Sequence, residues 1–171
     1  LELGADIIND ISGLSFDPDM AKVAARFGVP VIIMHIKGTP KDMQRDPRYE
    51  DVIGEIKDFL KEKIEYAVSC GVNPEQIVID PGLGFGKGHD HNLQILKHVQ
   101  EFRSLGKPIL IGHSRKGTIS KILGCKGPEE ALYGTLAISA YCAMNKIEII
   151  RVHDVLENRH VVEMIDAIQR A

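Results

Sequence analysis

Five short runs of mostly β-branched apolar residues recur along the chain, and each ends abruptly at polar, reactive side chains. Such runs are typical of parallel strands buried on both faces, where apolar and polar side chains need not alternate. They predict strands at about residues 6–11, 30–35, 77–81, 108–113 and 148–153. Because α/β proteins build their sites at the carboxyl ends of such strands, the pattern predicts one side of an enzyme pocket.

Helical patterns separate the predicted strands. From Glu50 to Cys70 apolar residues recur every three or four positions, and Gly71 is placed to end that helix. Further helices are expected after Asn92, from Pro128 onwards and over residues 161–171. This order predicts one α/β domain with a parallel sheet. Periodicity alone leaves two architectures open, a five-stranded doubly wound sheet and part of a (β/α)₈ barrel.

Composition narrows the class of protein. A net charge of −3 indicates no basic footprint for nucleic acid. The apolar runs are far shorter than the roughly 18 residues of a membrane span, and no cationic leader opens the chain. The cysteines number three and show no CxxC spacing, which favours a reducing compartment over a disulfide framework or zinc site. We therefore expect a cytoplasmic protein without nucleic-acid or membrane partners.

A glycine-dense segment follows the third predicted strand, from Asp80 to Gly88. Its spacing matches neither a Walker loop nor a dinucleotide-binding turn, so nucleotide binding is rejected here. Asp80 is the better candidate, because a carboxylate can accept two hydrogen bonds from the amidine-like edge of a 2-aminopyrimidinone. The simpler alternative is that Asp80 only stabilises its own turn. His89 and His91 lack a third metal ligand, and His91 with Asn92 is predicted to cap the following helix.

Two basic segments follow the last two predicted strands. Ser114, Arg115 and Lys116 precede a helix and suit an anion or a carbonyl group, although a solvated basic corner is the alternative. Arg151 and His153 share a face and suit a phosphate or diphosphate. Here the alternative is a surface pair of Arg151 with Asp154. Asn9 and Asp10, taken alone, read as turn residues.

Taken together, the polar segments resemble the dihydropteroate synthase family over essentially the whole chain. The matching segments, in order, are Asn9-Asp10-Ile11-Ser12-Gly13, Met34-His35-Ile36-Lys37-Gly38 with Pro40 and Met43-Gln44, Asp80-Pro81-Gly82-Leu83-Gly84-Phe85, Ser114-Arg115-Lys116 and Arg151-Val152-His153-Asp154. The resemblance implies a (β/α)₈ barrel, of which about the last five units are present. About three units, on the order of 95 residues, have no counterpart. We therefore expect the chain to be the carboxyl-terminal portion of a longer protein, unstable and inactive alone.

The resemblance also implies a reaction, the transferase step of folate biosynthesis that sulfonamides target. It joins p-aminobenzoate to 6-hydroxymethyl-7,8-dihydropterin diphosphate and releases dihydropteroate and diphosphate. Magnesium is expected as cofactor, with its ligand in the missing first strand, and a homodimer is expected for the full-length protein. By matching motif, the residues expected to bind substrate are Asn9, Met34, Asp80, Phe85, Ser114, Lys116, Arg151 and His153, of which Lys116, Arg151 and His153 are also expected to act in catalysis.

Each of these residues has an expected role from the same resemblance. Asn9 and Asp80 would hold the hydrogen-bonding edge of the pterin, and Lys116 its ring carbonyl region. Arg151 would cover the ring face and bind the diphosphate with His153. The apolar side chains of Met34 and Phe85 would line the substrate pockets, and Ser114 would lie near the benzoate carboxylate.

Two other functions remain open. A pterin-dependent methyltransferase using methyltetrahydrofolate would share the barrel and the strand-end Asn and Asp, but would not need the Ser114–Lys116 and Arg151–His153 segments. A non-catalytic pterin-binding module is the alternative of another class. It would bind pterin without turnover.

Overall fold

The structure is a computed structural model that describes all residues, 1–171. The chain divides into two compact units, Leu1–Ile109 and Leu110–Ala171, called here the amino-terminal and carboxyl-terminal units. Both are mixed α/β, and every strand pair in them is parallel. No helix combines the length and the apolar character needed to cross a membrane.

A three-stranded parallel sheet forms the centre of the amino-terminal unit. Its strands are β1 (Ile8–Asp10), β2 (Val31–Met34) and β3 (Ile77–Asp80), in the order β1-β2-β3. An isolated parallel bridge between Ile79 and Ile109 extends the pairing beyond β3. Val31, Ile33, Ile77 and Ile79 are fully buried. In the paired register these four side chains share one face of the sheet.

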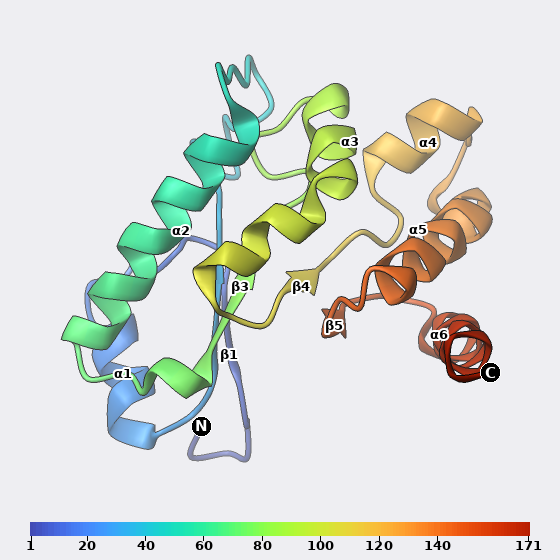
Figure 1. Cartoon of the computed structure of the whole chain (residues 1–171). Helices are drawn as coiled ribbons and strands as arrows, with labels where there is room; N and C mark the ends of the chain where they lie inside the picture. The colour runs from blue at the N-terminus through green and yellow to red at the C-terminus, as the bar shows by residue number, and fades with distance from the viewer. The chain divides into compact units, whose positions relative to one another are not determined.

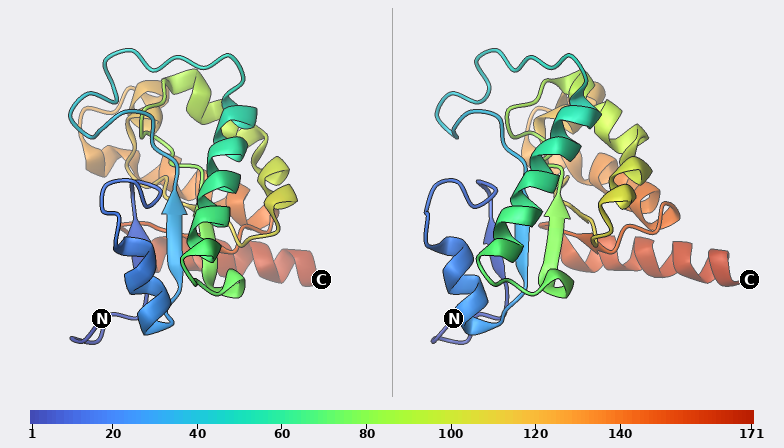
Figure 2. Two further views of the ribbon diagram at one scale, coloured as in Figure 1. Left: turned by 90° about the vertical axis from the view of Figure 1, so that its left-hand side faces the viewer. Right: turned by 60° about the vertical axis from the view of Figure 1, so that its left-hand side comes forward.

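Helices α1 (Met20–Phe27) and α2 (Val52–Ser69) lie on one side of these strands (Figures 1 and 2). α2 begins where the Asp51 carboxylate accepts hydrogen bonds from the N–H groups of Ile53 and Gly54. The remaining helical segments of the unit are η1 (Pro74–Gln76), α3 (His89–Lys97) and η2 (Val99–Leu105). Ile56 and Leu60 of α2 are fully buried, so this helix supplies much of the core.

The carboxyl-terminal unit contains two short parallel strands, β4 (Leu110–Ile111) and β5 (Ile149–Ile150). Its helical segments are α4 (Gly117–Leu123), η3 (Pro128–Ala131), α5 (Leu132–Met144) and α6 (Val155–Arg170). α5 and α6 pack against each other (Figure 1). Four small residues of α5 are buried, as close packing requires: Thr135, Ser139, Cys142 and Ala143.

Several element boundaries differ from the sequence predictions. The strands are shorter than the predicted ranges, because only part of each range is paired with a neighbouring strand. α3 begins at His89, not after Asn92, since the Nδ1 atom of His91 accepts a hydrogen bond from the Gly88 N–H in the first turn. α6 begins at Val155 and not at residue 161. The polar run from Glu157 to His160 conceals the apolar periodicity of its first turns.

Candidate functional site

Three of the predicted site residues share one face of the amino-terminal sheet. Asn9 pairs with Ile32, and Met34 pairs with Asp80 one step further along the sheet. Because Ile32 and Met34 are two residues apart on β2, their side chains point to the same face, and so do those of Asn9 and Asp80. This face is opposite to the one that carries Ile33 and Ile79. The register thus brings an amide, a thioether and a carboxylate to one surface.

Asp80 lies at the end of β3 and is buried, with 3% of its surface exposed. One of its carboxylate oxygens, Oδ1, accepts a hydrogen bond from the Gly82 N–H at 2.7 Å. The turn that follows is close to β2, because a Cβ at Gly82 would collide with the His35 carbonyl oxygen. Phe85, half-buried, donates its N–H to the Gly82 carbonyl. Asp80 therefore does stabilise its own turn through Oδ1, and this contact fixes the orientation of its carboxylate.

Asn9 and its neighbour Asp10 have different environments. Asp10 is buried, and its Oδ1 accepts hydrogen bonds from the Ser12 N–H and hydroxyl, both at 2.7 Å, and from the Leu14 N–H at 2.9 Å. It is thus the residue that stabilises the turn after β1. The side chain of Asn9 is exposed and takes no part in this turn.

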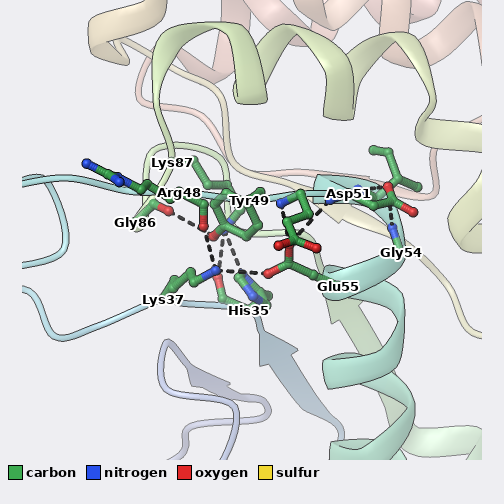
Figure 3. Close-up of polar contacts among 11 residues, drawn as sticks. His35, Lys37, Arg48, Tyr49, Asp51, Gly54, Glu55, Gly86 and Lys87 are labelled. Carbon is green, nitrogen blue, oxygen red and sulfur yellow. Dashed lines mark hydrogen bonds and ion pairs between the residues drawn. The ribbon is translucent and has the colours of Figure 1, made fainter.

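The amino-acid sequence alone did not reveal a buried lysine, Lys87, within the glycine-dense segment. Lys87 is only 2% exposed, and its ammonium lies 2.8 Å from Nδ1 of His35, with carbonyl oxygens of Phe85 and His35 at 3.0 and 3.3 Å (Figure 3). Burial, followed by the charges of Lys87 and Lys37, lowers the pKa of His35 to about 3. His35 is therefore neutral at physiological pH, with Nδ1 accepting from the ammonium. A lysine between two glycines gives no sequence signal of burial.

Lys37, two residues beyond His35, gathers a second polar cluster (Figure 3). Its ammonium lies 2.9 Å from the Glu55 carboxylate and 4.1 Å from the centre of the Tyr49 ring. The hydrogen bond from Lys37 lowers the pKa of Glu55. Tyr49 donates its hydroxyl to the Gly86 carbonyl at 2.8 Å, which ties this loop to the glycine-dense turn. An open cavity of about 690 Å³ adjoins the cluster. Its two cationic residues, Lys37 and Arg48, already form ion pairs with Glu55 and Asp46. Further carboxylates line the cavity, namely those of Glu50, Asp51 and Asp58.

Four other predicted site residues surround one cavity of the carboxyl-terminal unit. The cavity has a volume of about 470 Å³. Its lining residues are Gly112, Ser114, Arg115, Lys116, Arg151, Val152 and His153. They come from the segments that follow β4 and β5, which lie side by side because the Arg151 N–H donates to the Ile111 carbonyl at 3.1 Å. Three of the seven are cationic at neutral pH, so the cavity suits an anion.

Direct contacts join the two segments that line this cavity. The Ser114 hydroxyl lies 3.0 Å from Nδ1 of His153 and accepts from the His153 N–H at 3.2 Å. Asp154 forms its ion pair with Arg115, at 2.6 Å, and not with Arg151 as the surface alternative required. The hydrogen bond from Arg115 lowers the pKa of the Asp154 carboxyl group. Arg151 is exposed and makes no ion pair, so its guanidinium is accessible from solvent.

The predicted site residues are thus gathered within each unit. Asn9, Met34 and Asp80 share a sheet face in the amino-terminal unit, with Phe85 on the turn after β3. The carboxyl-terminal unit holds Ser114, Lys116, Arg151 and His153 around one cavity. Nowhere in the chain do three or more His, Cys, Asp or Glu side chains gather in a way that could hold a metal ion.

Comparison with known proteins identifies the family. A family model described as pterin binding enzyme matches residues 1–153. The chain belongs to the pterin binding enzyme family. Curated members with similar sequences include the dihydropteroate synthases of Synechocystis, 42% identical over 99% of this chain, and of Escherichia coli K12, 42% identical over 97%. The chain spans 59% and 58% of the lengths of these two relatives.

Solved structures of pterin binding enzymes have the same fold. A dihydropteroate synthase from Yersinia pestis in a sulfonamide complex superposes with a TM-score of 0.95, at 38% identity, covering 99% of this chain and 61% of that one. The Thermus thermophilus enzyme in complex with 6HMPPP gives a TM-score of 0.91 at 40% identity, covering 97% of this chain and 65% of the other. At these identities the similarity extends to sequence as well as backbone.

Proposed function

We propose that the protein containing this chain is a dihydropteroate synthase, which condenses p-aminobenzoate with 6-hydroxymethyl-7,8-dihydropterin diphosphate. One observation carries the proposal. The cavity lined by Lys116, Arg151 and His153 lies in a chain 42% identical to named dihydropteroate synthases. A cationic cavity is what a reaction that releases diphosphate needs. A methyltransferase, which releases none, does not account for it.

We further propose that the parallel strands β1 to β5 are the fourth to eighth strands of a (β/α)₈ barrel. The parallel pairing of the strands and the polar residues at their carboxyl ends support this architecture. The remaining strands would come from the part of the relatives' length that this chain does not span. On this basis we expect the chain alone to be inactive.

The chemistry assigned to the chain's residues needs no enzyme nucleophile. The amine nitrogen of p-aminobenzoate attacks the pterin methylene carbon, a C–N bond forms, and the C–O bond to diphosphate breaks with its electron pair leaving on oxygen. The nitrogen then loses a proton. Lys116, Arg151 and His153 would stabilise the negative charge on the departing diphosphate as preorganised donors. Arg151 would also cover the pterin face.

The pterin would lie against the shared sheet face of the amino-terminal unit. Asp80 would accept hydrogen bonds from the 2-amino and ring N–H edge, and Asn9 would complete the polar rim. Met34 and Phe85 would contribute apolar contacts, and Ser114 would lie near the benzoate carboxylate. Asp80 is 3% exposed, and its contact with the Gly82 N–H orients the carboxylate that would accept these hydrogen bonds.

Magnesium would supply charge neutralisation for the diphosphate when bound. This chain offers no cluster of three or more side chains that could hold a metal ion. We propose a cytoplasmic location on the basis of the reaction class and the free cysteines.

A homodimer is also proposed, through helices of the carboxyl-terminal unit. Large apolar side chains are exposed on α5 and α6, among them Tyr133 at 81%, Met164 at 63% and Ile168 at 63%. Exposed apolar area of this kind is typical of an interface. Sedimentation of the full-length protein should give a dimer, and a Met164→Glu, Ile168→Glu variant should shift it to monomer.

The test of function is turnover by the full-length protein given pterin diphosphate and p-aminobenzoate, compared with an Asp80→Asn variant. Pterin affinity, measured by calorimetry, should fall in that variant by about 1–3 kcal/mol, the cost of a mispaired buried group. Asp90→Asn, at an exposed position on α3, is the matched control. Pterin binding without turnover would indicate a non-catalytic module. Methyl transfer that depends on cobalamin would indicate a methyltransferase.

A further inference from the structure

Arg115 and Asp154 connect the two segments that line the cavity of the carboxyl-terminal unit. Nη2 of Arg115 lies 2.6 Å from Oδ1 of Asp154, and Nε donates to Oδ2 at 3.2 Å. Arg115 follows β4, whereas Asp154 immediately precedes α6. A planar guanidinium that makes two bonds to one carboxylate fixes orientation as well as distance.

The backbone of Arg115 is in a conformation that needs support. Its φ is +56°, in the left-handed region that residues with a Cβ rarely adopt. The Arg115 N–H donates to the hydroxyl of Thr135, a fully buried residue of α5, at 3.2 Å. Strained backbone persists where surrounding contacts hold it, and such positions cluster at functional sites. Here the strained residue lies directly between Ser114 and Lys116.

Asp154 is held from the other side by a buried chain of polar groups. Its carbonyl oxygen accepts from Nδ2 of Asn158 at 2.7 Å, and Asn158 in turn accepts from the Ser139 hydroxyl. That hydroxyl also lies 2.8 Å from Nε2 of His113. His113 precedes Ser114, so the polar chain returns to the segment that carries Arg115. The two segments are therefore joined by the ion pair and also by this buried series of hydrogen bonds.

The ion pair between Arg115 and Asp154 affects the charge around the cavity. Asp154 next to an anion site would repel the ligand, but its charge is balanced by that of Arg115. The pair contributes no net charge of its own, and Lys116 and Arg151 also line the cavity. Arg151 has no ion pair of its own, in contrast to Arg115.

We propose that Arg115 and Asp154 are positioning residues that hold Lys116, Arg151 and His153 around the anion, and that Arg115 is not itself an anion ligand. The proposal rests on the function proposed above, in which this cavity receives the diphosphate. Arg115, the middle residue of the Ser114-Arg115-Lys116 segment, would thus fix the conformation of the loop. The two readings of Arg115 predict opposite effects of removing Asp154.

The experiment measures inhibition by inorganic diphosphate and the KM for pterin diphosphate in the full-length protein. The variants are Arg115→Ala, Asp154→Ala and the double variant. For positioning residues, both single variants should raise the inhibition constant about 10- to 100-fold, the range found when supporting residues are lost. The double variant should be no worse than the more affected single variant, because either change breaks the same contact.

A direct ligand role for Arg115 gives a different pattern. Asp154→Ala would then free the guanidinium and leave diphosphate binding unchanged or tighter. That result would overturn the proposal, and so would additive effects in the double variant. Arg115→Lys, which keeps the charge but loses the two-point contact, should recover only part of the affinity under the positioning role.

Controls separate positioning from folding and from the proposed function. Arg159 and Glu163 form an exposed i,i+4 ion pair on α6, the helix that Asp154 precedes. Replacing either with Ala should leave diphosphate inhibition unchanged. The thermal midpoint shows whether each variant is folded. Should Arg115→Ala fail to fold, Arg115→Lys and Asp154→Asn provide the same comparison. An unmodified protein that neither turns over nor binds diphosphate overturns both proposals, whereas normal turnover with unaffected variants overturns only this one.

Discussion

The ammonium group of Lys87 lies 2.8 Å from Nδ1 of His35, although neither side chain is exposed by more than 4%. Lys87 lies in the glycine-dense turn after β3, and His35 follows β2. The contact therefore holds the turn that begins at Asp80 against the end of the neighbouring strand. A buried cation is favourable only while its acceptors remain in place.

Replacing Lys87 with Met should destabilise the protein. The change leaves His35 Nδ1 and two carbonyl oxygens without this donor, so we expect a loss of about 2–4 kcal/mol in the free energy of unfolding. Urea denaturation of the full-length protein measures it, with Lys97→Met as control, since Lys97 is exposed on α3. A Lys87→Met variant as stable as the parent would mean that desolvation of the ammonium cancels its hydrogen bonds.

Stability should fall as the pH is lowered from 7 to 5. His35 has its pKa lowered to about 3 in the folded state by burial and the charge of Lys87. The unfolded state binds the proton near pH 6.5, so between these values unfolding takes up a proton and becomes more favourable. For His35 alone we expect a loss of about 2 kcal/mol over this range. Burial also lowers the pKa of His113, which adds in the same direction.

The contribution of His35 is isolated by His35→Gln. The slope of unfolding free energy against pH should be shallower in this variant than in the parent, whatever its stability at pH 7. His160→Gln, at an exposed position on α6, should keep the parent slope. Equal slopes for the parent and His35→Gln would contradict a neutral, buried His35.

Gly86→Ala should be much more damaging than Gly28→Ala. Both glycines have positive φ, 66° and 62°, so the backbone cost of a Cβ is about the same. A Cβ at Gly86 would collide with the Lys37 carbonyl oxygen, whereas a Cβ at Gly28 meets nothing within 4 Å. We expect about 1 kcal/mol for Gly28→Ala and at least about 2 kcal/mol more for Gly86→Ala. Similar losses in thermal unfolding would mean that the turn can move away from Lys37.

The strand ends could be predicted from sequence because β-branched runs and the polar residues after them are both local signals. Asp80, Ser114 and Lys116 could therefore be predicted from sequence to lie at or just after strand ends. Strand length was overestimated, since pairing depends on the neighbouring strand. β4, for example, has only Leu110 and Ile111 in regular pairing.

Contacts between distant segments account for what the sequence did not reveal. Arg115 and Asp154 are 39 residues apart, and their pairing depends on where α6 begins and on a left-handed backbone at a non-glycine residue. Lys87 is buried only because the turn after β3 folds back onto His35. Side-chain type predicts charge, but the partner of a charge is set by tertiary structure.

Removing the Tyr49 hydroxyl should loosen the loop between β2 and α2 from the glycine-dense turn. Tyr49 is half-buried, and its hydroxyl donates to the Gly86 carbonyl at 2.8 Å while its ring lies under the Lys37 ammonium. Tyr49→Phe keeps the ring and loses only this bond, so we expect about 1 kcal/mol less stability and faster amide exchange in the turn. Tyr133→Phe, with the hydroxyl of an 81% exposed side chain removed, is the matched control and should change neither. If Tyr49→Phe matches that control in both measurements, the hydroxyl does not hold the turn, and the buried Lys87 contact alone accounts for its position.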